Sequence, residues 1–245
     1  MFYVMKLTIS YNGTHFSGWQ RQQRKRTVQG VIEQKLSELF RNKIEIDGAG
    51  RTDRGVHAYG QVATFGVETT IPQEKFHLLI NRRMPADIHI VSTEIVDESF
   101  HARYSAKGKR YAYKIHHGLE KNPMVADSHL HVAHTLDVAK MKSAAEKLIG
   151  EKDFRAFMAS GSSVKNTVRE IYDISFKEDN ELLVIEFHGN GFLYNMVRII
   201  VGMLLDVEAS RLPIEKIDQI VESKDRTQLK HTAPPEGLYL VKVYY

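Results

Sequence analysis

The chain has 245 residues, of which 42% are hydrophobic and 26% are charged, a composition typical of an ordinary soluble globular protein. It contains no cysteine, which excludes disulfides, thiolate zinc sites and cysteine catalysis and fits a protein of the reducing cytoplasm. The net charge of +4 slightly favours polyanionic partners, and the sequence shows neither an apolar run as long as a membrane span nor a secretory signal at its start.

Strand and helix patterns alternate along the first part of the chain, which predicts an α/β (α+β) architecture. Residues 3–11 are predicted to form a strand. Thr27 is the expected N-cap of a helix that continues through Phe40, with apolar residues along one face. The other elements predicted here are a short strand at Ile44 and Ile46, a strand over residues 62–67, a helix that starts at Pro72 and is ended by Pro85, and a strand over residues 88–96.

A second set of elements follows in a similar order. The predicted strands cover residues 110–116, 168–176, 182–188 and 238–245, and the predicted helices cover residues 138–149, 195–207 and 214–221. We therefore predict two similar α/β halves, residues 1–104 and residues 105–245, which meet near residues 100–108.

The segment of residues 48–58 (GAGRTDRGVHA) is the most informative part of the sequence. Its three glycines bracket Asp53, which has Arg51 two residues before it and Arg54 directly after it. Glycines permit a tight turn that presents one side chain, and nearby positive charge favours the ionised carboxylate. Such a carboxylate can act as a nucleophile or a base. A glycine-rich turn with a surface ion pair is the alternative interpretation, and for an arbitrary loop it would be favoured.

This segment resembles the catalytic motif of the TruA family of tRNA pseudouridine synthases, in which the run G-R-T-D-x-G-V-H-A carries the catalytic aspartate. Two departures are visible: Arg54 stands where the family more often has a small residue, and His15-Phe16 replaces a commoner version with tyrosine. The resemblance extends in the family's order to residues 11–20 (YNGTHFSGWQ), 109–113 (KRYAY), 191–198 (GFLYNMVR) and 233–238 (APPEGL).

The resemblance implies a pseudouridine synthase fold, with two similar halves whose mainly antiparallel sheets join into one, helices packed on it, and a central cleft. It implies an isomerase that converts uridine to pseudouridine at positions 38, 39 and 40 of the tRNA anticodon stem-loop, without a cofactor or metal. The implied homodimer would bind tRNA across both subunits. The site residues it implies are Asp53 as the catalytic group, Arg198 as its partner, Tyr111 as the residue that stacks on the target uracil, and Arg51 as the residue that helps displace the base.

Each of these roles has a simpler alternative. Tyr111, Tyr113 and Ile115 share one strand face, so core packing competes with base stacking and is favoured for the last two. Arg198 starts a strongly apolar segment, where an ordinary buried ion pair would explain a charge. Arg51 would otherwise be a simple charge partner of Asp53. Whether Asp53 attacks the base, attacks the sugar or removes a ribose proton stays open.

Clustered cations suggest where RNA phosphates could bind. Residues 20–26 (QRQQRKR) hold four cations between a predicted strand and a predicted helix, although most such runs are merely solvated loops. The candidate RNA-binding residues are Arg21, Arg24, Lys25, Arg26, Lys109 and Arg110.

Two rival functions are also considered. The first is a metal hydrolase, because the run His129, His131 and His134 is similar to a metal-binding run. The run lacks a nearby aspartate, so we expect no metal there. The rival to an enzyme is a non-catalytic RNA-binding module, because residues 109–115 loosely resemble the aromatic strand of an RNA recognition motif.

Overall fold

The structure is a computed structural model that describes residues 2–162 and 164–245. It divides into two compact units, which are described separately. The first unit comprises Met1–Lys107 together with Tyr239–Tyr245, and the second comprises Gly108–Leu238. The final strand is therefore grouped with the first unit, although it lies at the opposite end of the sequence.

The first unit is built on a mainly antiparallel sheet with the strand order β4-β1-β3-β10, and the short β2 also pairs with β3. Strand β1 is antiparallel to both β3 and β4, whereas β10 pairs in parallel with β3. The strands are β1 (Phe2–Tyr11), β2 (Asp47–Gly48), β3 (His57–Glu68), β4 (Ile88–Val96) and β10 (Leu238–Tyr244).

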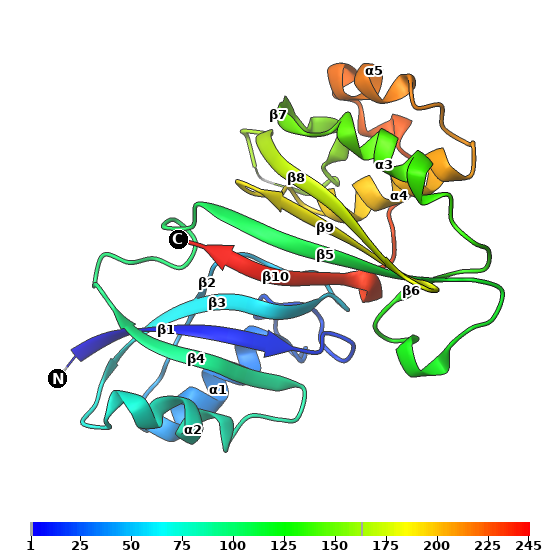
Figure 1. Cartoon of the computed structure of the whole chain (residues 1–245). Helices are drawn as coiled ribbons and strands as arrows, with labels where there is room; N and C mark the ends of the chain where they lie inside the picture. The colour runs from blue at the N-terminus through cyan, green and yellow to red at the C-terminus, as the bar shows by residue number, and fades with distance from the viewer. Residues whose placement is uncertain (1, 163) are drawn as a thin grey trace. The chain divides into compact units, whose positions relative to one another are not determined.

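Two helices, α1 (Val28–Phe40) and α2 (Phe76–Asn81), lie on the same side of this sheet (Figure 1). The predicted start of α1 is confirmed, because the Thr27 side chain accepts a hydrogen bond from the Gly30 N–H at 3.3 Å. Along β1 the side chains alternate, and those that face the helices are fully buried. This core includes Met5, Leu7 and Ile9 of β1 and Val28, Ile32 and Leu36 of α1.

The second unit has a sheet with the strand order β5-β9-β8-β7, in which neighbouring strands are antiparallel and β6 pairs in parallel with β5. Asn180 forms the turn between β8 and β9 with a φ of 53°, a conformation that asparagine tolerates better than most residues. The strands are β5 (Gly108–His117), β6 (Leu130–Val132), β7 (Gly150–Asp153), β8 (Val168–Asp179) and β9 (Leu182–Gly189).

Three α-helices complete the second unit, namely α3 (Val138–Glu146), α4 (Met196–Glu208) and α5 (Lys216–Ser223). Most of α4 is buried, which explains its nearly continuous apolar sequence, and it packs against α3. Single 3₁₀ turns occur at Gln73–Lys75, Pro123–Val125, Arg155–Phe157, Arg226–Gln228 and Pro235–Gly237. Among the described residues, no helix combines the length and the apolar character needed to cross a membrane.

The predicted fold class, a mixed α/β (α+β) fold with mainly antiparallel sheets and packed helices, is confirmed, but several element ends differ. The short strand expected at Ile44 and Ile46 is wrong: both side chains are buried, yet only Asp47–Gly48 makes the ladder. Strand β3 begins at His57, because that residue pairs with β10. Helix α3 ends at Glu146, before the part-exposed Ile149.

Candidate active site

Asp53 lies in the first unit, on the loop of residues 49–56 between β2 and β3, which we name the Asp53 loop. Its side chain is half-buried, whereas Arg51 and Arg54 are exposed. The Val56 N–H donates to the Asp53 carbonyl oxygen at 3.1 Å and closes a turn in which Gly55 has a φ of 81°. A residue with a side chain would be strained at that φ. The backbone therefore presents Asp53 on a tight, constrained turn.

The residues beside Asp53 are held by the segment of residues 11–20. The Tyr11 hydroxyl and Thr52 Oγ1 share a buried hydrogen bond of 2.7 Å, and the Trp19 N–H donates to the Thr52 carbonyl oxygen at 3.0 Å. Gly18, with a φ of 90°, lies so close that a Cβ there would be 2.7 Å from that same oxygen. The conformation of the Asp53 loop is thus fixed from one side by backbone and neutral side-chain contacts.

Two further glycines allow the same close approach. A Cβ on Gly13 would lie 2.0 Å from the Val56 carbonyl oxygen, and the Gly13 N–H donates to His57 Nδ1 at 3.1 Å. A Cβ on Gly48 would lie 2.6 Å from Nε1 of the Trp19 ring. The glycines that made both segments conspicuous in the sequence are therefore points where the two segments touch.

Two buried neutral side chains, those of Tyr11 and Gln61, hydrogen-bond residues of the Asp53 loop. Burial raises the pKa of the Tyr11 hydroxyl far above its usual value, despite its hydrogen bonds with Thr52 and Gln61, so Tyr11 stays neutral at physiological pH. Gln61 is fully buried, and its Nε2 donates to the Gly50 carbonyl oxygen at 2.9 Å. Neutral groups can hold the loop without competing for the charge of Asp53.

Arg51 precedes Asp53 by two residues and reaches across to the 11–20 segment. Its Nε donates to Gln20 Oε1 at 3.0 Å, and its side chain is exposed. The predicted role of Arg51 in base displacement stays a prediction. Its observed contact shows that the guanidinium already has a fixed partner in the protein.

Arg198 lies in the second unit, in the first turn of α4, and its guanidinium is bound on two edges. Its Nε donates to the Ala233 carbonyl oxygen at 2.7 Å, and its Nη1 donates to Asn195 Oδ1 at 2.8 Å. The Ala233 N–H donates in return to the Arg198 carbonyl oxygen at 2.9 Å. Ala233, the first residue of the motif at residues 233–238, and Asn195 thus set the plane of the guanidinium.

Tyr111 lies on β5 of the second unit and is 9% exposed. Its ring packs edge to face against the ring of Phe192, with 5.2 Å between the two ring centroids. The core interpretation of Tyr113 and Ile115 is confirmed, since both are fully buried. The Tyr113 hydroxyl donates to the Pro234 carbonyl oxygen at 2.7 Å, and burial raises its pKa, with a further contribution from Glu236. Base stacking by Tyr111 stays a prediction.

The candidate RNA-binding cations differ in their protein partners. Arg21 Nη1 lies 2.8 Å from the Glu33 carboxylate. Arg26 makes a bidentate pair with Asp87, at 2.7 and 2.9 Å, and lies 4.0 Å from the centre of the Phe16 ring. Arg24 and Lys25 are exposed, Lys109 and Arg110 are half-buried, and Arg110 lies 3.8 Å from Glu186. Arg21 and Arg26 therefore form ion pairs within the protein. RNA contact by any of the six candidate residues stays a prediction.

The histidine run has local partners. His131 Nε2 is 3.0 Å from the Gly118 carbonyl oxygen, and His134 Nε2 is 3.2 Å from Glu208 Oε2. Within residues 2–162 and 164–245, no group of three or more His, Cys, Asp or Glu side chains is arranged to hold a metal ion.

Sequence reasoning missed two buried polar residues of α1, Gln29 and Glu33, which are 7% and 6% exposed. They stand one helical turn apart, beside the apolar stripe that was predicted for this helix. A polar pair with this spacing next to a buried stripe was the signal that could have identified them.

Comparison with known proteins places this geometry in a family. The model of a family described as tRNA pseudouridine synthase matches residues 7–105 and 144–245, which include both Asp53 and Arg198. The chain is 49% identical over 243 residues to a tRNA pseudouridine synthase A of Ruminiclostridium cellulolyticum, covering 98% of this chain and 99% of that one. It is 46% identical over 241 residues to the protein of that name from Acetivibrio thermocellus, with the same coverage. The chain therefore belongs to the tRNA pseudouridine synthase family.

Proposed function

We propose that this protein isomerises uridine to pseudouridine at positions 38, 39 and 40 in the anticodon stem-loop of tRNAs, with Asp53 as its catalytic group. The observation that carries the proposal is the Asp53 loop, where a carboxylate is presented on a turn fixed by Tyr11, Trp19 and Gly13. Family membership favours an enzyme over the alternative, a non-catalytic RNA-binding module.

The reaction breaks the bond between ribose and a uracil nitrogen and forms a bond from ribose to a uracil carbon. That carbon, C5, loses its hydrogen to solvent as the product forms. An ionised carboxylate could start the sequence in three ways: by attacking the sugar, by attacking the base, or by removing a ribose proton. All three need a carboxylate in a fixed position, which the constrained turn around Asp53 supplies.

The other site residues take the roles that the family resemblance implies. Arg198 pairs with Asp53 and keeps it ionised, which the two hydrogen bonds that orient its guanidinium support. Tyr111 stacks on the extruded uracil, and the edge-to-face contact with Phe192 supports a fixed ring orientation. Arg51 fills the space that the base leaves, which its exposed, planar cation suits.

The proposal extends to partners and setting. The exposed Arg24 and Lys25 contact tRNA phosphates, assisted by Arg21 and Arg26 of the same basic loop (residues 20–26) and by Lys109 and Arg110. The protein acts as a homodimer in the cytoplasm, without a cofactor or metal. The halves of residues 1–104 and 105–245 supply the catalytic loop and the stacking and pairing residues, respectively.

The test compares wild-type protein with Asp53→Asn on tRNA that contains 5-tritiated uridine. Wild type is expected to release tritium, and carbodiimide treatment followed by primer extension is expected to map the product to positions 38–40. The variant is expected to lose essentially all turnover while its tRNA affinity stays within about tenfold, or ~1.4 kcal/mol. Near-normal turnover by Asp53→Asn would refute the assignment, and activity that EDTA abolishes and an added metal restores would refute the absence of a metal.

A further inference from the structure

Helix α1 carries a polar pair, Gln29 and Glu33, that is nearly as buried as the apolar stripe beside it. The Glu33 side chain is only 7% exposed. A buried carboxylate is costly unless it is paired and fully hydrogen-bonded, so the partners of this pair identify what it holds.

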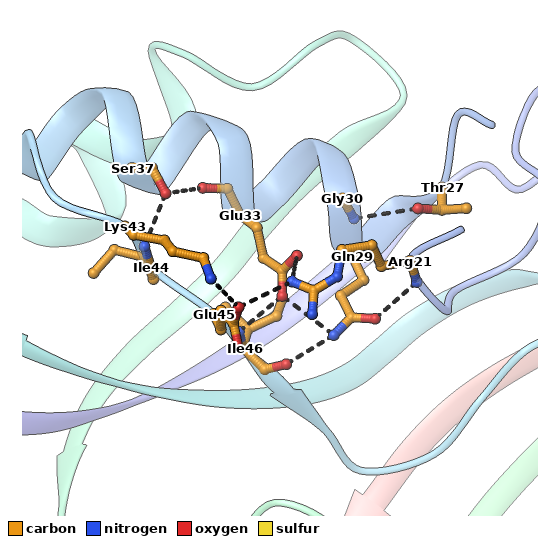
Figure 2. Close-up of polar contacts among 10 residues, drawn as sticks. All are labelled: Arg21, Thr27, Gln29, Gly30, Glu33, Ser37, Lys43, Ile44, Glu45 and Ile46. Atoms are coloured by element: carbon orange, nitrogen blue, oxygen red, sulfur yellow. Dashed lines mark hydrogen bonds and ion pairs between the residues drawn. The ribbon is translucent and has the colours of Figure 1, made fainter. Parts of the chain in front are cut away.

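Glu33 uses both carboxylate oxygens, and Figure 2 shows the contacts. Its Oε2 accepts from Arg21 Nη1 at 2.8 Å. Its Oε1 accepts from the Ile46 N–H at 3.1 Å and from Gln29 Nε2 at 3.2 Å. Because Gln29 Nε2 also donates to the Ile46 carbonyl oxygen at 2.9 Å, the Gln29 amide can point in only one direction. Its Oε1 is thereby left as an acceptor.

Gln29 then binds the backbone on both sides of Gln20. Its side-chain Oε1 accepts from the Arg21 N–H at 2.9 Å, and its own main-chain N–H donates to the Trp19 carbonyl oxygen at 3.0 Å. Gln20 is thus held between two anchored peptide groups. The side-chain Oε1 of Gln20 in turn accepts a hydrogen bond from Arg51 Nε at 3.0 Å.

The same pair also controls the backbone that leads to Arg51. Both the N–H and the carbonyl oxygen of Ile46 are bound by the pair, and β2 and the Asp53 loop follow directly. Gln29 and Glu33 therefore anchor both Gln20, the side-chain partner of Arg51, and the backbone that leads to Arg51. Gln20 and Arg51 are 31 residues apart in the sequence.

We propose that Gln29 and Glu33 are positioning residues that act through Gln20 to hold Arg51 in the orientation for displacing the target base. The inference rests on the proposed function and deepens it. An exposed arginine has many rotamers, and fixing one of them before the substrate arrives removes an entropic cost from the reaction. The side chains of Gln29 and Glu33 bind Arg21, Ile46 and each other, and we expect their effect on the reaction to pass through Arg51.

The experiment measures single-turnover tritium release from tRNA labelled with 5-tritiated uridine, together with tRNA affinity and melting temperature. Glu33→Gln keeps the side-chain size but removes the charge that pairs with Arg21 and leaves one accepting oxygen where the carboxylate had two, so the bond to Arg21 or the bonds to Ile46 and Gln29 are lost. We expect a rate about tenfold or more below wild type, with tRNA affinity changed less than the rate. The control is Glu38→Gln, the same substitution on the exposed face of the same helix, where the carboxylate binds only Lys35 and Gln34 in the contacts found there. This control is expected to react at the wild-type rate.

The decisive comparison repeats Glu33→Gln in an Arg51→Ala background. If the pair acts through Arg51, the second substitution lowers the rate by less than about twofold there. Equal slowing in both backgrounds would mean that the pair acts independently of Arg51, and it would overturn the inference. Should Glu33→Gln fail to fold, Gln20→Ala leaves the pair intact and removes only the acceptor for Arg51. Its rate is expected to fall likewise, and a wild-type rate for Gln20→Ala would overturn the inference. Absence of tritium release by the wild type itself would instead overturn the proposed function.

Discussion

Gly13→Ala tests whether the 11–20 segment holds the Asp53 loop in its working position. The new Cβ would lie 2.0 Å from the Val56 carbonyl oxygen, and an ordinary contact begins near 3.4 Å, so one backbone must move by about 1.4 Å. The Val56 N–H donates a hydrogen bond to the Asp53 carbonyl oxygen, so the displacement is expected to reach Asp53. A misplacement of about 1 Å can lower a rate ~100-fold, and overpacking costs about 1–3 kcal/mol of stability.

The assays are single-turnover tritium release and thermal unfolding. For a chain of this size a loss of about 1–3 kcal/mol lowers the Tm by roughly 2–12 °C. The matched control is Gly150→Ala, where φ is 94° and no atom of the described residues lies within 4 Å of the new Cβ. It costs about 1–2 kcal/mol through backbone strain alone and is expected to leave turnover unchanged. Wild-type turnover in Gly13→Ala, or an equal loss in Gly150→Ala, would refute the reasoning.

Three further predictions concern charge. Arg198→Lys keeps a charge but loses the fork that binds Ala233 and Asn195, so turnover is expected to fall far more than the Tm; equal activity in the folded variant would contradict the pairing with Asp53. Burial raises the pKa of Asp153, but hydrogen bonds with Lys224 and Thr167 outweigh it and hold the folded-state pKa below the usual value. Asp153→Asn is therefore expected to lower the Tm at neutral pH, and the deficit is expected to shrink as the pH falls below about 4 and to disappear once the pH is below the lowered folded-state pKa of Asp153; a deficit that does not shrink below pH ~4 would contradict this. Finally, tRNA affinity is expected to fall steeply with added salt while the single-turnover rate of bound tRNA changes little, and a parallel loss of both would argue against phosphate contacts as the main source of affinity.

Much of the fold could be predicted because local signals agreed with the final packing. The strand over residues 88–96 was predicted with its observed ends, since Pro85 ends the element before it and the segment is rich in β-branched residues. Thr27 marked the start of α1 through its capping side chain. The strand expected at Ile44 and Ile46 was wrong because buried side chains do not require a hydrogen-bonded ladder, and the ladder itself comprises only two residues. Strands β6 and β7 are too short to leave a period in the sequence.

The candidate site likewise contains one residue that the sequence indicates and supporting contacts that it does not. Asp53 was conspicuous because its neighbouring glycines and arginines are adjacent in sequence, and the structure shows the turn that they permit. The hydrogen bond between Tyr11 and Thr52, and the bonds that Gln29 and Glu33 make with Arg21 and Ile46, could not be predicted. Each depends on partners from distant segments, and a polar residue in a helix reads as solvated until its neighbours are known.

Two loops of the first unit are held by different kinds of contact. The Asp53 loop is held by neutral hydrogen bonds and close backbone packing, from Tyr11, Gln61 and Gly13, whereas the basic loop of residues 20–26 is held by ion pairs through Arg21 and Arg26. Neutral buried bonds are insensitive to salt, whereas exposed ion pairs and phosphate contacts are screened by it. The contacts of the Asp53 loop with Tyr11, Gln61 and Gly13 are thus expected to hold their geometry as the ionic strength changes. This separation is the physical reason to expect that salt weakens tRNA binding and leaves the geometry of the Asp53 carboxylate unchanged.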